Sequence, residues 1–181
     1  MNKVILGVLL AIVLAFAGAY VCLEKGYVNF SADQPPSPME AKLAMAAVDA
    51  STNRRAPEGE NPLQPTEKNV TLGAQIYLDH CAGCHGVPSN PDSQFARSFN
   101  PPAPGFFKDA PDMADNQNFY IIQHGIRWTG MPAWNSTLND TQIWEVVAFL
   151  SSIGKLPPAA QKILGPSGPT PTAPPTQHHH H

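Results

Sequence analysis

Two cysteines and a histidine within five residues have the clearest chemical meaning in this 181-residue sequence. Cys81 and Cys84 are separated by two small residues, and His85 follows directly. The spacing C-x-x-C-H is typical of covalent haem attachment, in which both thiols bond to one porphyrin edge and the histidine binds the iron. We therefore predict one covalent haem c, with His85 as an axial ligand.

Two other interpretations of these residues are a redox-active dithiol and a zinc site. A dithiol of the thioredoxin type requires a strand–helix–strand context, and no alternating strand pattern is convincing in this sequence. A zinc site of Cys81, Cys84, His85 and His124 has suitable ligand types, but three ligands in five residues lie too close for the usual paired arrangement. Haem attachment is the favoured interpretation.

The second axial ligand is predicted to be Met131. A low-spin c-type haem needs a ligand on the face opposite the histidine. Gly130 and Pro132 flank this methionine and fix the loop that presents its thioether. The weaker candidates are His80, Met113, His124 and the methionines of residues 26–66.

The N-terminal residues 1–25 are predicted to form a transmembrane anchor. Val4–Leu23 contains 20 uncharged residues, which as a helix span about 30 Å, the thickness of the bilayer hydrocarbon. A cleaved signal peptide is the alternative, because residues 17–19 resemble a small-residue cleavage site. Either interpretation places the rest of the chain on the periplasmic or other extracytoplasmic side.

Residues 26–66 are predicted to be an extended, proline-rich tether. It is interrupted by a short helix near residues 38–50, because Ser37, Pro38 and Glu40 form an N-terminal capping pattern. At the other end, residues 165–181 are predicted to be a disordered tail that ends in the remainder of a histidine tag.

The globular domain is predicted to cover residues 67–164 and to be all-α. One helix leads to Cys81, a second covers residues 119–124 and a third begins after Asn139. Residues 88–111 contain six prolines, which exclude regular secondary structure and predict an irregular loop. A net charge of -3 without a basic cluster excludes a nucleic-acid-binding surface.

With these residues, the domain resembles a class I cytochrome c of the membrane-anchored bacterial type. The resemblance rests on the C-x-x-C-H motif, the Met131 loop and a closing helix with Trp144 and Phe149. It implies a small helical fold around one covalent haem. It also implies that the first and last helices cross, with Gly73 of one facing Trp144 of the other.

The resemblance further implies a proline whose carbonyl accepts a hydrogen bond from Nδ1 of His85. The candidates are Pro101, Pro102 and Pro104. Two residues near the Met131 loop, Arg127 and Trp128, are also candidates for the haem environment, as partners of a haem propionate. Surface exposure is the alternative for Arg127, and packing in the protein core is the alternative favoured for Trp128.

One-electron transfer is the expected function, because iron bound on both faces has no open site for a substrate. The chain is then a carrier and not an enzyme, with a quinol-side donor, an oxidase or reductase acceptor, and the membrane as partners. One alternative is a haem relay subunit of a larger respiratory complex. Another is a haem enzyme or gas sensor with an open iron site.

Overall fold

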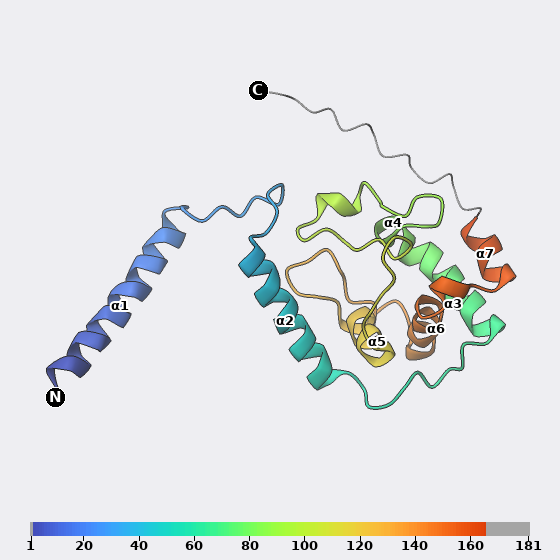
Figure 1. Ribbon diagram of the computed structural model, residues 1–181, viewed down its shortest axis with the longest axis horizontal. Helices are drawn as coiled ribbons and strands as arrows, with labels where there is room; N and C mark the ends of the chain where they lie inside the picture. Colours follow the sequence, from blue (N-terminus) through green and yellow to red (C-terminus); the bar gives the residue numbers. More distant parts are fainter. Residues whose placement is uncertain (1, 166–181) are drawn as a thin grey trace, which may run out of the picture. The chain divides into compact units, whose positions relative to one another are not determined.

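The computed structural model describes residues 2–165 of the chain (Figure 1). The predicted C-terminal tail therefore lies outside the described residues, apart from Gly165. The chain divides into two compact units between Ala32 and Asp33.

The first unit contains one helix, α1 (Lys3–Glu24). Its most apolar 18-residue stretch has a mean hydropathy of 2.7, and none of the 22 residues is buried by the protein. Among the described residues it is the one helix long and apolar enough to span a membrane. Apolar side chains around the whole circumference are what a lipid environment requires.

The second unit begins with α2 (Pro38–Arg55), which is longer than the helix predicted near residues 38–50. Its start follows the predicted capping box, in which the Ser37 hydroxyl accepts from the Glu40 N–H and the Glu40 carboxylate accepts from the Ser37 N–H, both at 3.3 Å. The additional turn ends in Arg54 and Arg55, and positive charge there complements the helix dipole.

Five further α-helices build the domain, and within residues 2–165 only an isolated bridge, Val87 to Asn90, has strand-like pairing. The predicted all-α class is therefore confirmed. The helices are α3 (Glu67–His80), α4 (Ala82–His85), α5 (Asp115–His124), α6 (Asp140–Leu150) and α7 (Pro158–Leu164). The sequence did not predict α7, which packs against α3 and buries Ala160 and Leu164.

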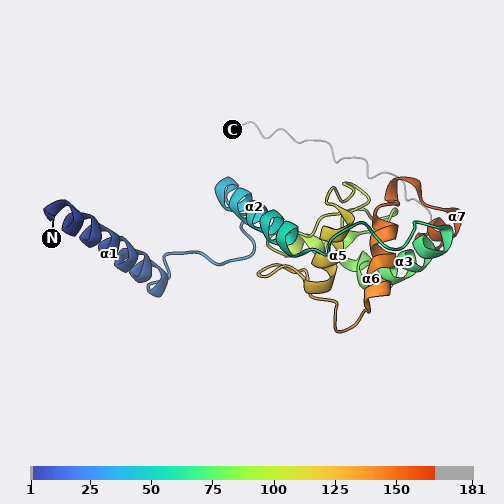
Figure 2. The same ribbon diagram turned by 90° about the horizontal axis from the view of Figure 1, so that it is seen from below.

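The crossing of α3 and α6 is the centre of the domain (Figure 2). A Cβ atom at Gly73 would lie 2.0 Å from the carbonyl oxygen of Glu145 and 2.9 Å from Cβ of Phe149, so only glycine allows this approach. The expected pairing of Gly73 with Trp144 is wrong. Trp144 instead stacks on Phe119 of α5, with ring centroids 4.1 Å apart.

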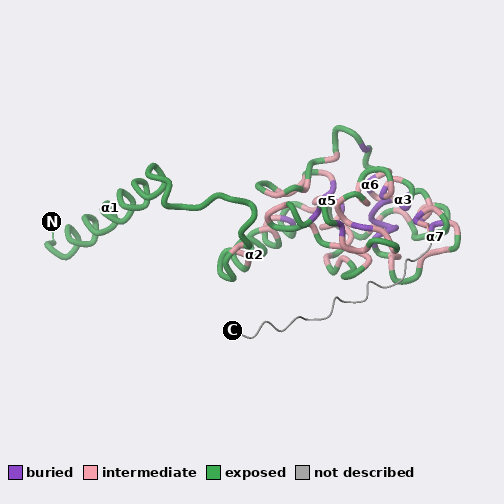
Figure 3. Tube along the Cα trace, turned by 90° about the horizontal axis from the view of Figure 1, so that it is seen from above, coloured by how far each residue is buried: buried purple, intermediate pink, exposed green. Residues whose placement is uncertain are grey.

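The core is made by apolar side chains of α3, α5, α6 and α7, and the buried segments of Figure 3 concentrate along α3, α5 and α6. Its largest fully buried side chains are Val70, Tyr77, Ile143, Val146, Val147 and Phe149. These positions recur at helical spacing within α3 and α6, which is why the two helices pack along their length.

Candidate haem-binding site

The C-x-x-C-H residues lie on a single turn directly after α3. The N–H of Cys81 donates to the Tyr77 carbonyl at 2.8 Å, and the N–H groups of Cys84 and His85 donate to the Cys81 carbonyl at 3.1 and 2.9 Å. Both cysteines are free and half-buried. The two thiols are therefore available to one ligand that lies against this turn.

The imidazole of His85 is fixed by a proline carbonyl. Its Nδ1 lies 2.9 Å from the oxygen of Pro104, and of the three candidate prolines this is the one that makes the hydrogen bond. A carbonyl can only accept, so Nδ1 carries the proton and Nε2 keeps a free lone pair. Burial lowers the pKa of His85, and the bond to Pro104 opposes this in part. A neutral imidazole at physiological pH suits metal ligation.

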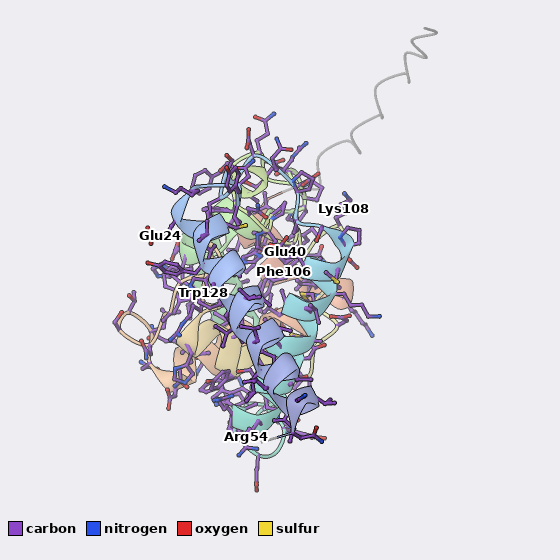
Figure 4. The ribbon with its side chains drawn as sticks, turned by 90° about the vertical axis from the view of Figure 1, so that its left-hand side faces the viewer. Glu24, Glu40, Arg54, Phe106, Lys108 and Trp128 are labelled. Carbon is purple, nitrogen blue, oxygen red and sulfur yellow. The ribbon has the colours of Figure 1, made fainter. Side chains whose placement is uncertain are left out.

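Phe106 supports the same ring from its side. The two rings are stacked, with centroids 4.2 Å apart and planes within 4° (Phe106 is labelled in Figure 4). The N–H of Phe106 donates to the His85 carbonyl at 3.0 Å. The irregular loop predicted for residues 88–111 therefore holds the histidine through both Pro104 and Phe106.

Tyr77 and Ser93 are further residues that position this turn. The Tyr77 hydroxyl donates to the Gly86 carbonyl at 2.7 Å, and the Ser93 hydroxyl donates to the Gly83 carbonyl at 2.7 Å. Burial raises the pKa of Tyr77, so its hydroxyl stays protonated and remains a donor. Neither role could be predicted from the sequence, because helical spacing reveals the buried ring of Tyr77 but not the partner of its hydroxyl.

We predict that Tyr77→Phe lowers the free energy of unfolding of the haem-loaded protein by about 1–3 kcal/mol, because the buried Gly86 carbonyl loses its partner. Urea denaturation measures the change. Tyr120→Phe is the matched control, since the Tyr120 hydroxyl makes no hydrogen bond to the part of the chain that the structure describes. Equal losses in both variants would contradict the assigned role of Tyr77.

The Met131 loop is closed by its own hydrogen bonds. The N–H of Ile126 donates to the Met131 carbonyl at 3.2 Å, and the N–H of Met131 donates to the Thr129 hydroxyl at 3.1 Å. That hydroxyl donates in turn to the Ile126 carbonyl at 2.8 Å. The Met131 side chain is half-buried against the core. A loop of this kind holds a thioether in one place.

Gly130 brings the Met131 loop against the loop of residues 88–111. A Cβ atom at Gly130 would lie 2.6 Å from the ring of Phe99. The segments that carry His85, Pro104 and Met131 are therefore neighbours.

The other candidate ligands have different surroundings. His80 is exposed and lies against Trp134, with ring centroids 5.3 Å apart. His124 is exposed beside Tyr120 at 4.5 Å. The zinc alternative is wrong, because within residues 2–165 no three His, Cys, Asp or Glu side chains come together to hold a metal ion. Residues 2–165 also contain no strand–helix–strand unit, which a dithiol site of the thioredoxin type requires.

Arg127 and Trp128 are both exposed, and the expected packing of Trp128 against the protein is wrong. Its side chain is 90% exposed and its backbone has φ of 62°, a left-handed conformation that is unusual for a bulky residue (Figure 4). The turn from Ile126 to Thr129 imposes this conformation.

Trp128→Gly is expected to raise the free energy of unfolding of the haem-loaded protein by about 1 kcal/mol, because glycine adopts this conformation without strain and no packing is lost. Urea denaturation and the haem absorbance spectrum test it together. A loss of stability with a changed spectrum would instead place Trp128 against the haem.

The residues of this site fit a haem c. Two free thiols lie on one turn, and the histidine beside them keeps Nε2 available. Around them, several apolar side chains pack on the core but keep exposed surface that a porphyrin can cover. They are Cys81, Ala82, Phe106, Phe107, Met131 and Trp134.

Comparison with known proteins supports the same class. Residues 68–150 match the family model described as "Cytochrome C oxidase, cbb3-type, subunit III". The chain is also 30% identical over 94 residues to the cbb3-type cytochrome c oxidase subunit FixPc of Rhizobium leguminosarum bv. viciae. This alignment covers 45% of the chain and 27% of the relative, so the chain spans about a quarter of the relative's length.

A solved structure, the Kuenenia stuttgartiensis reducing HAO-like protein complex Kustc0457/Kustc0458, is similar over 54% of this chain and 50% of that chain. The sequence identity is 23% and the TM-score is 0.45.

The matched region and the motif define a mono-haem c-type cytochrome domain with one covalent haem c. The expected resemblance to the membrane-anchored cytochromes c is thus confirmed. Residues 68–150 are therefore similar to c-type cytochromes, and α1 is an apolar helix long enough to anchor the chain in a membrane.

Proposed function

We propose that this protein carries single electrons between redox partner proteins. The observation that carries the proposal is the His85–Pro104 hydrogen bond, which leaves Nε2 of the histidine free beside the two thiols. Haem c supplies reversible one-electron storage when bound. The protein's part is to hold the haem in one geometry in both oxidation states.

In this proposal, Cys81 and Cys84 form the two thioethers, and His85 and Met131 are the axial iron ligands. The closed hydrogen bonds of the Met131 loop support the methionine as a permanent ligand. Pro104 orients the imidazole and strengthens the nitrogen as a donor. Arg127 is exposed near this loop and is available to a haem propionate, while Pro101 and Pro102 take no part that a contact supports.

We further propose that α1 is retained as the anchor and that the haem domain lies on the periplasmic side. The partners are then a quinol-side electron donor and an oxidase or reductase acceptor near the same membrane. Confinement of carrier and partner to one membrane raises their effective concentration without a tight interface.

Carbon monoxide binding to the reduced protein tests the closed iron site. We expect no change in the spectrum of the reduced haem under carbon monoxide, together with a redox titration that fits a single one-electron step. Rapid formation of a carbon monoxide adduct in the unaltered protein would favour a haem enzyme or gas sensor instead.

A second candidate is a relay subunit of a larger oxidase complex. It is favoured by the matched family, whose model describes an oxidase subunit, and by the relative, which is also an oxidase subunit. Extraction in a mild detergent separates the two candidates. A stable stoichiometric complex favours the relay subunit, and a single anchored chain favours the free carrier.

A further inference from the structure

The segment between α2 and α3 is attached to the haem domain at several places, although its sequence is typical of a tether. The amide of Asn116 donates to the Pro57 carbonyl at 3.0 Å, and the amide of Asn61 donates to the Trp144 carbonyl at 3.1 Å. These contacts join residues 57–61 to the start of α5 and to the middle of α6. A solvated tether makes no such contacts.

The end of α2 is fixed in the same way by Thr52, which is only 3% exposed. Its hydroxyl accepts from the Gln117 amide at 3.1 Å and donates to the Val48 carbonyl at 3.0 Å. A buried hydroxyl needs partners, and the donor that this one accepts from belongs to α5. Figure 4 labels Glu40 and Arg54 near the two ends of this helix. Before α2, the Asn100 amide donates to the Gln34 carbonyl at 2.9 Å.

We propose that residues 38–66 are a structural part of the haem domain, and that the connector to α1 is at most residues 25–37. These 13 residues reach at most about 45 Å when fully extended, whereas all 42 residues 25–66 would reach about 150 Å. The length of this connector therefore sets the greatest distance that can separate residue 38 from the end of α1.

The shorter connector also restricts which electron partner the haem can reach. This step rests on the proposed function. The effective concentration of a tethered group falls roughly as the −3/2 power of linker length. A connector of 13 instead of 42 residues raises it about sixfold. The electron partner is therefore a protein embedded in the same membrane, with its own redox centre near the membrane surface.

Pulsed EPR on the full-length, haem-loaded protein tests the attachment. After haem attachment Cys22 is the one remaining cysteine of three, so Cys22→Ser with Lys42→Cys places a single nitroxide on the exposed side of α2. The distance from this nitroxide to the ferric haem is expected to have one narrow distribution. A broad distribution in otherwise unaltered protein would overturn the proposal.

Two variants at neighbouring positions sharpen this measurement. Thr52→Arg puts a charged side chain into the buried contact with α5, and we expect it to broaden the distance distribution. Asn53→Arg is the matched control, because Asn53 is exposed, and its distribution is expected to stay narrow. An unchanged haem spectrum shows that the domain is folded. Distributions equally narrow in both variants would refute the assigned contact.

A flexible Gly/Ser spacer of roughly 30 residues between Val28 and Asn29 tests the consequence for the partner. In native membranes, the initial rate of haem oxidation is expected to fall about sixfold. An unchanged rate would overturn the limit on reach. The EPR experiment needs only ferric haem, so its result does not depend on electron transfer. If the haem exchanges electrons with no membrane protein, the proposed function is refuted, but the attachment of residues 38–66 is not.

Discussion

Gly73→Ala is expected to lower the free energy of unfolding by about 3 kcal/mol or more, as the severest cases of overpacking do. The added Cβ atom would lie 2.0 Å from the carbonyl oxygen of Glu145. This neighbour is backbone inside α6, so no side-chain rotation can relieve the contact. The helices α3 and α6 would have to separate, which disturbs the core beside the C-x-x-C-H turn. Urea denaturation of the haem-loaded variant measures the loss.

The matched control is Gly154→Ala, since a Cβ atom at Gly154 meets nothing within 4 Å. We expect the free energy of unfolding of this variant to stay within about 0.5 kcal/mol of the unaltered protein. If Gly73→Ala is equally harmless, the close approach of α3 and α6 is not a feature of the folded protein.

Met131→Ala is expected to remove the long-wavelength sulfur-to-iron band from the ferric spectrum. The reduction potential should also fall, on the order of 0.1 V, because a methionine ligand raises the potential and axial ligands set it over roughly 0.8 V. Absorbance spectroscopy and a redox titration of the same sample check both effects.

Met113→Ala is the control for this variant. Met113 is also half-buried, but it lies directly before α5, outside the hydrogen-bonded Met131 loop. Its variant should keep both the band and the potential. A band that persists in Met131→Ala and disappears in Met113→Ala would exchange the roles of the two methionines.

The chemistry of the site could be predicted from the sequence because it depends on local spacing. Cys81, Cys84 and His85 need only one turn of chain to come together, and Gly130 and Pro132 mark the Met131 loop by type. The proline that forms a hydrogen bond with His85 could not be identified from the sequence. Pro101, Pro102 and Pro104 are alike in sequence, and only the path of the loop brings the Pro104 carbonyl to His85.

Features that depend on distant contacts were missed or wrongly predicted. The crossing of α3 and α6 was expected, but Trp144 was predicted to face Gly73. Phe149 and the Glu145 backbone face it instead, and the sequence could not distinguish the two aromatics because both lie on the same short helix. Residues 57–66 are rich in proline and polar side chains, which is typical of a tether. Their attachment depends on amide side chains, such as Asn61 and Asn116, whose partners lie far along the chain.

The alkaline pyridine spectrum of the purified protein tests the central claim most directly, that one haem is covalently bound through Cys81 and Cys84. We predict the spectrum of a c-type haemochrome at one haem per chain, and no haem extracted by acidified acetone. Cys81→Ala and Cys84→Ala should each alter the spectrum, because one thioether is lost. A protein that carries no haem, two haems per chain, or a haem that acidified acetone removes would contradict the account.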